Sequence, residues 1–263
     1  MIVKKLGNHV FSKADLGSGK ASLGSWITVG HPSIAEIIAK AGFDWVVVDL
    51  EHSTMNIETA GELIRTIDLC GVASLIRLTS NDASQIKRVM DAGAHGILVP
   101  MVNSASEAAN AVAATRYAPL GSRGVGLSRA QGYGTRFKEH LQWQEDGPIV
   151  VVQIEHQDAV AHLDEILATP GVDGFIIGPY DLSCSLGFPG EFEREEFVRA
   201  VTHIREVGKR LGCPAGMHIV EPDVRRLEEC IHDGYTFIAY SVDFRMLDVS
   251  AREGVEGFKK LLK

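Results

Sequence analysis

The sequence predicts a TIM-type (β/α)8 barrel, an α/β fold, built as a single domain over residues 1–263. Eight apolar segments alternate with amphipathic segments of helical periodicity, which matches a barrel better than an open doubly wound sheet. Most of the apolar segments are continuous runs of Val, Ile and Leu, so they indicate strands buried on both faces, as in a parallel sheet. No G-x-G-x-x-G follows the first segment, which disfavours a dinucleotide-binding fold.

Each expected strand is an apolar run bounded by turn residues. In chain order the expected strands are Leu23–Gly30, Phe43–His52, Val72–Thr79, Gly96–Val102, Ile149–Glu155, Gly174–Asp181, Pro214–Val220 and Tyr235–Val242. At four junctions a glycine suited to end a helix stands shortly before the strand, namely Gly42, Gly93, Gly171 and Gly234.

Helices are expected between these strands, several of them with clear start signals. Ser33 and Glu36 have the spacing of a capping box, as do Ser104 and Glu107, and Asn56 is a further N-cap candidate. The expected helices cover residues 33–41, 56–70, 82–92, 104–116, 195–211, 223–232 and 249–262, with one more between the fifth and sixth strands.

One segment, residues 117–147, breaks this alternation and is far longer than the usual link between elements. It is rich in Gly and Arg, includes Arg123 and Arg129, and then carries a short amphipathic stretch over residues 136–144. We expect this excursion to form a subunit interface or to cover a neighbouring active site.

Composition narrows the class of protein. The formal net charge of −8 argues against a nucleic-acid or anionic-membrane partner, and no window resembles a transmembrane span. The N-terminal stretch lacks a long apolar core, so no secretory signal is expected. The four cysteines show no C-x-x-C spacing, which predicts free, buried thiols in a reducing cytoplasm.

In a barrel of this type the functional residues lie at the carboxyl ends of the strands and in the loops that follow. The polar or functional candidates there are Trp26, His31, Asp49, Glu51, His52, Arg77, Met101, Gln153, Glu155, Tyr180, Asp181, His218, Glu221, Ser241 and Asp243. Acids, a histidine and an arginine at the ends of strands two, three, five and six favour an enzyme.

Glu155 and Asp181 end two consecutive expected strands, so both carboxylates should meet at one edge of the sheet. Hard divalent cations such as Mg²⁺ and Mn²⁺ prefer oxygen ligands of this kind, and we therefore expect this pair to hold one metal ion. The alternatives are that Glu155 is a solvated acid and that Asp181 caps the turn after its strand. Gln153 shares one face of its strand with Glu155, which favours a buried polar site.

His52 and Arg77 are the candidates for a base and a charge stabiliser. A guanidinium inside an apolar strand requires an anion, whereas His52 could instead bond to the backbone at its strand end. Asp49 and Glu51 are equally compatible with a structural ion pair and with a functional role.

Together these residues lie in motifs that resemble the HpcH/HpaI family of class II, metal-dependent pyruvate aldolases, of the 2,4-dihydroxyhept-2-ene-1,7-dioate aldolase type. The resemblance covers the chain from about Leu23 to its end. The matching motifs are LGSW (Leu23–Trp26), DLEH (Asp49–His52), IR (Ile76–Arg77), DAGAHGILVPMV (Asp91–Val102), RYAPLGSRGVG (Arg116–Gly126), VQIE (Val152–Glu155) and GPYDLSCSLG (Gly178–Gly187).

The resemblance implies a barrel of the phosphoenolpyruvate/pyruvate-binding type and a divalent metal ion (Mg²⁺, Mn²⁺ or Co²⁺) that chelates pyruvate. It assigns Glu155 and Asp181 as metal ligands. Gln153 and the backbone at Tyr180 would contact the substrate, and Arg77 would stabilise the enolate oxygen. The resemblance makes His52 the base and gives Asp91 the role of raising its basicity. It also implies a homo-oligomer, a trimer or hexamer, often with an exchanged last helix.

The implied reaction is the reversible cleavage of a 2-keto-4-hydroxy acid to pyruvate and an aldehyde. A Lewis acid and a guanidinium would stabilise the negative charge that develops on the ketone oxygen. No lysine ends an expected strand, so a Schiff-base mechanism is disfavoured. The alternatives are a related enolate enzyme, such as an oxaloacetate decarboxylase or a citramalyl-type lyase, and a non-catalytic barrel.

Two residues depart from the simplest form of this scheme. Asp91 lies near the end of a helix that precedes its strand, which places it at the amino end of the barrel, so local bending or a neighbouring subunit must bring it to His52. Tyr180 stands where the family commonly has a small residue before the metal-binding aspartate. Trp26, Met101 and His218 follow strands whose loops are expected to set the aldehyde.

Overall fold

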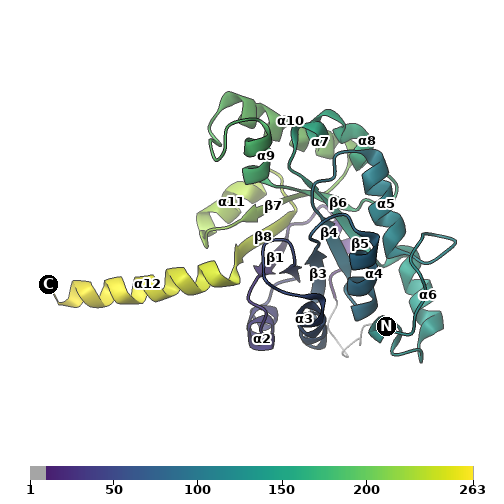
Figure 1. The fold of residues 1–263 in the computed structure, drawn as a ribbon. Coiled ribbons are helices and arrows are strands. Elements are labelled where there is room, and N and C mark those ends of the chain that lie inside the picture. The colour runs from purple at the N-terminus through teal and green to yellow at the C-terminus, as the bar shows by residue number, and fades with distance from the viewer. Residues whose placement is uncertain (1–9, 263) are drawn as a thin grey trace.

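The computed structural model describes residues 10–262, and within that range eight parallel strands close into a barrel (Figure 1). The strands are β1 (Ser22–Ile27), β2 (Trp45–Asp49), β3 (Ala73–Arg77), β4 (Gly96–Val99), β5 (Ile149–Ile154), β6 (Gly174–Ile177), β7 (Ala215–Ile219) and β8 (Phe237–Val242). Each strand pairs with the next, and β1 pairs with β8, so the predicted fold class is confirmed. Residues 1–9, part of the N-terminal stretch in which no secretory signal is expected, and residue 263 lie outside the described residues.

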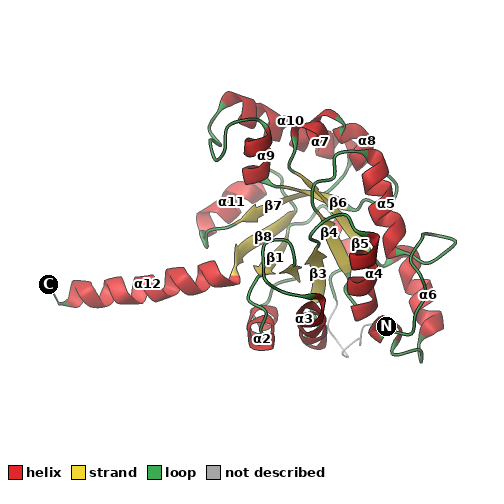
Figure 2. Ribbon diagram, viewed as in Figure 1, coloured by secondary structure: helices red, strands yellow, loops and turns green. Residues whose placement is uncertain are grey.

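Helices alternate with the strands and cover the outside of the barrel (Figure 2). They are α1 (Lys13–Leu16), α2 (Pro32–Lys40), α3 (Ile57–Leu69), α4 (Ala83–Ala92), α5 (Ala105–Thr115), η1 (Arg129–Gln131), α6 (Phe137–Asp146), α7 (Gln157–Ala161), α8 (Leu163–Leu167), α9 (Pro179–Ser185), α10 (Glu195–Leu211), α11 (Val224–His232) and α12 (Asp243–Leu261). The glycines expected to end helices all have the positive φ that this role requires, between 87° and 105° at Gly42, Gly93, Gly171 and Gly234.

Three helix predictions were wrong in detail. Ser33 is not an N-cap, because Pro32 already occupies the first helical turn and the ring of His31 accepts the Ser33 N–H instead. The single helix expected between β5 and β6 is two short helices that meet at His162. The last helix starts at Asp243, whose carboxylate accepts the Thr28 and Val29 N–H groups and so fixes the chain as it leaves β8.

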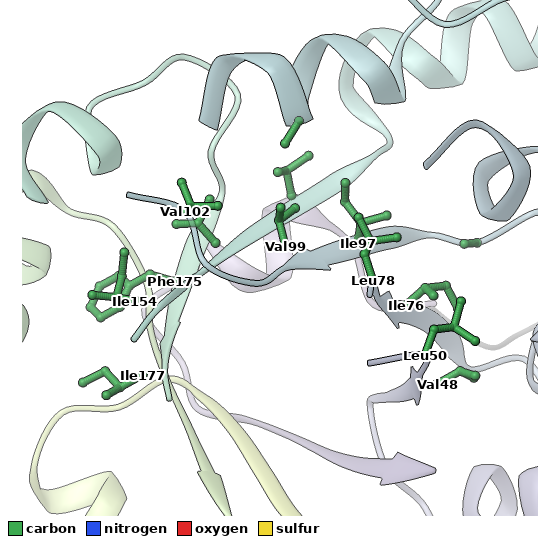
Figure 3. Close-up of a cluster of buried hydrophobic side chains, with 14 of the residues drawn as sticks. Val48, Leu50, Ile76, Leu78, Ile97, Val99, Val102, Ile154, Phe175 and Ile177 are labelled. Carbon is green, nitrogen blue, oxygen red and sulfur yellow. The ribbon is translucent and has the colours of Figure 1, made fainter. Parts of the chain in front are cut away.

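The strands separate two apolar cores. One fills the barrel and is closed at the amino end by Trp45 and Phe237, whose rings stack with centroids 3.9 Å apart. The other lies between the strands and the surrounding helices, and Figure 3 shows its side chains on β2, β3, β4, β5 and β6. Because successive side chains of a strand point to opposite faces, every second residue points into the barrel. Gln153 and Arg77 occupy such inward positions near the carboxyl ends of β5 and β3.

The excursion over residues 117–147 folds against the barrel through η1 and α6. Arg129 forms an ion pair with Asp68, and the fully buried Arg123 side chain lies 4.2 Å above the Tyr117 ring and 3.0 Å from His140 Nε2. Its apolar residues Leu120, Val125, Leu127 and Tyr133 are exposed. The interface role expected of the excursion stays a prediction.

Helix α12 extends away from the barrel, at the left of Figure 1. Within it only Asp243 is buried, while Leu247, Val255, Phe258 and Leu261 are exposed. Among residues 10–262 every helix is too short or too polar to cross a membrane. The cysteines are free as predicted, but only Cys230 is buried, and Cys184 is exposed on the short helix α9.

Candidate active site

A cavity of about 400 Å³ opens at the carboxyl end of the barrel. The predicted site residues that line it are Trp26, His52, Arg77, Gln153, Tyr180 and Asp181. A cavity of about 610 Å³ at the amino ends of β7 and β8 contains none of the predicted site residues. Six predicted residues converge here from β1, β3, β5, the loop after β2 and α9, which makes the smaller cavity the candidate active site.

Glu155 follows β5 and, like Gln153, lies on the inward side of that strand, as the alternation of residues predicts. It is only 2% exposed, so it is not a solvated acid. One carboxylate oxygen accepts the Met101 N–H at 2.7 Å, and the other accepts from the amide of Gln153. Burial raises the pKa of Glu155 to about 7, and the charges of Glu51 and Asp181 add to this shift.

The expected strand end at Asp181 was wrong, because β6 stops at Ile177. Gly178 and Pro179 then begin α9, since proline at the first helical position has a φ suited to a helix. Asp181 lies in the first turn of α9 and is exposed to the cavity. Its carboxylate makes no hydrogen bond to any residue within 10–262, so a role as a helix cap is excluded.

The pair Glu155 and Asp181 fits a hard divalent cation, because two carboxylates at this edge repel one another and leave their charge uncompensated. Gly178 keeps the space beside them open, since a Cβ there would lie 2.5 Å from Glu155 Oε2. The described residues contain no group of three or more His, Cys, Asp or Glu able to hold a metal. Mg²⁺ commonly binds through one or two carboxylates and completes its shell with water and substrate oxygens. The two carboxylates therefore suit a metal ion whose remaining coordination positions are filled by water and by substrate oxygens.

Arg77 forms ion pairs with both acids of the preceding strand end. Its Nε and Nη2 atoms lie 2.8 and 2.5 Å from the two Asp49 oxygens, and Nη1 lies 3.1 Å from Glu51. Burial alone would lower the pKa of Arg77, but the hydrogen bond and charge of Asp49 raise it. Burial also raises the pKa of Glu51 to about 6 against the opposing charge of Arg77. Asp49 and Glu51 therefore form the ion pairs with Arg77 that were one of the two expected alternatives, and these pairs hold Arg77 at the cavity.

His52 lies in the loop after β2 and is exposed at the cavity. Its backbone N–H, not its ring, donates to Asp49 at 3.3 Å. Within the described part of the chain the ring has no hydrogen-bond partner, so the imidazole is free to contact a ligand.

Trp26 and His218 form a stacked pair at the mouth of the barrel that the sequence did not predict, since β1 and β7 are distant in the chain. Their ring centroids lie 4.5 Å apart, and the guanidinium of Arg77 lies 5.3 Å from the Trp26 ring centre. His218 Nε2 is 3.0 Å from the Ser241 carbonyl oxygen, so this nitrogen carries the proton. Burial lowers the pKa of His218 to about 4 and keeps it neutral. Trp26 Nε1 is buried with no partner among the described residues.

Asp91, Met101 and Glu155 lie outside the cavity lining, although Glu155 contacts Gln153, which is part of it. Asp91 is near the C-terminal end of α4, with one oxygen 3.9 Å from Arg123 Nη1, so a single chain does not bring it to His52. Met101 contributes only its backbone N–H to Glu155. Tyr180 is 60% exposed and packs edge-on against Phe192 with centroids 5.0 Å apart.

Known proteins resemble this chain over most of its length. The family model described as HpcH/HpaI aldolase/citrate lyase matches residues 22–248. The chain is 38% identical over 255 residues to the 4-hydroxy-2-oxo-heptane-1,7-dioate aldolase of Salmonella paratyphi C, covering 93% of this chain and 94% of that one. It is 36% identical over 250 residues to the 5-keto-4-deoxy-D-glucarate aldolase of Klebsiella pneumoniae, covering 94% and 96%. A solved HpcH/HpaI aldolase/citrate lyase family protein from Burkholderia cenocepacia superposes with a TM-score of 0.89 at 30% identity, covering 94% of this chain and 98% of that one.

Proposed function

Because the chain belongs to the HpcH/HpaI aldolase/citrate lyase family, we propose that it is a metal-dependent aldolase that reversibly cleaves a 2-keto-4-hydroxy acid to pyruvate and an aldehyde. It is an enzyme of the carbon–carbon lyase class. The observation that carries the proposal is one cavity that is lined by Asp181, a guanidinium and a free imidazole. The buried Glu155 lies directly behind this lining, bonded to the Gln153 amide and close enough to Asp181 for the charge of Asp181 to raise its pKa. The divalent ion (Mg²⁺, Mn²⁺ or Co²⁺), its ligands and the role of each residue are parts of this proposal.

In the proposed reaction the residues of the chain divide the work between charge and proton transfer. Glu155 and Asp181 would hold the divalent ion, which when bound supplies a Lewis acid for the carboxylate and ketone oxygens of pyruvate. Each terminal nitrogen of Arg77 has a second N–H free for the enolate oxygen, while Asp49 and Glu51 fix its orientation. Gln153 and the backbone at Tyr180 would position the substrate.

His52 is the proposed base, because its ring is exposed to the cavity and has no partner among the described residues. It would remove the proton of the C4 hydroxyl as the C3–C4 bond breaks and would return a proton in the reverse direction. The Trp26 ring, which is stacked on His218 and only 2% exposed, lines the cavity and would limit the access of water.

A pyruvate-release assay tests the proposal directly. Purified enzyme is given 4-hydroxy-2-oxo acids with Mg²⁺, Mn²⁺ or Co²⁺, before and after thorough chelation with EDTA. Activity is expected to disappear with EDTA, to return with added metal and to be lost in E155Q. D158N is the matched control, because Asp158 is a mostly exposed carboxylate three residues away. Activity that survives chelation would contradict the metal-dependent mechanism.

Oxaloacetate belongs in the same assay, because the family description includes citrate lyases. Oxaloacetate turnover much faster than any aldol cleavage would favour the alternative of a decarboxylase or a citramalyl-type lyase.

We further propose a homo-oligomer, a trimer or hexamer, whose contacts involve α12 and the excursion over residues 117–147. The exposed apolar side chains of α12 and of the excursion support this, because a surface of this kind favours a second copy of the chain. Asp91 could reach a His52 only from another copy or after local bending. Sedimentation of F258D is expected to give a smaller species than wild type, and a monomeric wild type would contradict the proposal. The four free cysteines support a cytoplasmic location.

A further inference from the structure

We propose, on the premise of the function above, that the aldehyde half of the substrate is uncharged and largely apolar. The preferred substrate is then a 2-keto-4-hydroxy acid whose only carboxylate is the one next to the ketone. The inference rests on two features of the cavity: the apolar side chains on one wall and the distribution of charge around it.

The apolar wall is formed by Val220, Val242, Phe244 and Tyr180. Val220 follows β7, Val242 ends β8, and Phe244 lies in the first turn of α12, so three of the four come from neighbouring strand ends. Tyr180 adds its ring from α9, where Phe192 supports it edge-on. Phe244 is 48% exposed and Tyr180 60% exposed, so both rings are accessible to a ligand.

The charges around the cavity are mainly negative. Arg77 is the only lysine or arginine among the described residues that line it, and Asp49 and Glu51 already pair with that guanidinium. Glu155 and Asp181 are committed to the proposed metal. His218 is neutral and directs its N–H to the Ser241 carbonyl.

A second carboxylate on the aldehyde half would therefore enter the cavity without a cationic partner. The acidic side chains around the pocket would repel an unpaired anion, whereas an alkyl or aromatic chain would pack on the apolar wall. This distinguishes the chain from the relative named as a 4-hydroxy-2-oxo-heptane-1,7-dioate aldolase, whose named substrate is a dicarboxylate.

A matched pair of substrates tests the inference. 4-Hydroxy-2-oxoheptanoate and 4-hydroxy-2-oxoheptane-1,7-dioate have the same carbon chain and differ only in the terminal carboxylate. In each the C4 hydroxyl loses its proton, the C3–C4 bond breaks to give the aldehyde, and the electron pair forms the pyruvate enolate, which is then protonated at C3. We expect kcat/KM to be at least about tenfold higher for the monoacid. An equal or higher value for the diacid would overturn the inference.

A charge-introducing variant gives a second readout that does not depend on the absolute rate. V220K places an ammonium on the apolar wall and is expected to raise the diacid-to-monoacid ratio of kcat/KM several-fold. V224K is the control, because Val224 is exposed on α11 and does not line the cavity, so it should leave the ratio unchanged. An unchanged ratio in V220K would contradict the assigned wall.

Exchange of the pyruvate methyl protons with solvent deuterium, followed by NMR, separates the two hypotheses. This reaction requires enolisation but no aldehyde. Metal-dependent exchange together with a diacid preference would overturn only the inference about the aldehyde. If exchange is absent and neither substrate releases pyruvate, the proposed function fails and the inference fails with it.

Discussion

Arg77 and Asp49 are register partners on neighbouring strands and form a two-pronged ion pair where β2 and β3 end. Their Cα atoms are paired in the ladder, and the guanidinium contacts both oxygens of the carboxylate, which is only 2% exposed. Contact through two nitrogens fixes the plane of a guanidinium as well as its position. The orientation of Arg77 toward the cavity is therefore determined by a residue that was not assigned to the reaction.

D49N is expected to lower kcat by about 10- to 100-fold while the barrel stays folded, because a misdirected guanidinium stabilises the enolate oxygen less well. Glu51 keeps one ion pair, so the loss of stability should be limited to about 1–3 kcal/mol. Steady-state kinetics with urea denaturation separates the two effects.

E62Q is the matched control for this substitution, because Glu62 and Arg65 form an exposed ion pair on α3. It should change neither kcat nor stability measurably. A D49N enzyme with wild-type kcat would show that Arg77 needs no fixed orientation.

The barrel could be predicted from the sequence because its signals are local. Runs such as Trp45–Asp49 identify doubly buried strands, and glycines such as Gly93 mark helix ends through a positive φ that other residues adopt at a cost. Boundaries were less predictable where a side chain acts across the fold. The start of α12 depends on contacts of Asp243 with Thr28 and Val29, which directly follow β1 and lie more than 200 residues earlier in the sequence.

The residues of the site were likewise predictable only where a local sequence pattern places them. Inward alternation placed Gln153 and Glu155 on one face, and the same rule could have assigned Asp49 and Glu51 to the face that meets Arg77. The stacking of Trp26 on His218 depends on how the sheet closes, so no local pattern predicts it. The apolar wall could not be predicted from the sequence either, because Val220 and Phe244 carry no signal of function until the fold brings them together at the cavity.

Metal binding should stabilise the wild-type protein and not E155Q. Without metal, E155Q is expected to be at least as stable as wild type, because the amide removes a buried carboxylate whose pKa burial raises to about 7. With Mn²⁺ the thermal midpoint should rise for wild type and for the D158N control only. Calorimetry with Mn²⁺ gives the affinities independently of activity, and equal affinities for wild type and E155Q would rule out Glu155 as a ligand.

Acid should destabilise the fold through His95, which is 4% exposed and accepts the Ser74 N–H on Nδ1. Burial lowers the pKa of His95 from 6.5 to about 4 in the folded protein. The unfolded chain therefore binds more protons between these values, so stability is complete above about pH 6.5 and falls as the pH decreases toward 4.

H95N keeps an acceptor near the Ser74 N–H but cannot titrate. The free energy of unfolding of wild type should fall by up to about 3 kcal/mol more than that of H95N between pH 6.5 and 4. Urea titrations at several pH values measure both curves, and parallel curves would contradict the assignment.

Gly178 provides a test of the metal site that leaves every proposed ligand in place. A Cβ at this position would lie 2.5 Å from Glu155 Oε2 and 2.8 Å from Glu155 Cβ, so G178A must displace that side chain. We expect Mn²⁺ affinity to fall by about tenfold or more, because metal coordination tolerates little displacement of a ligand. G126A is the control, since a Cβ at Gly126 would meet no atom within 4 Å. Calorimetry on both variants decides the question: if G178A binds Mn²⁺ as tightly as G126A, the metal does not depend on this position of Glu155.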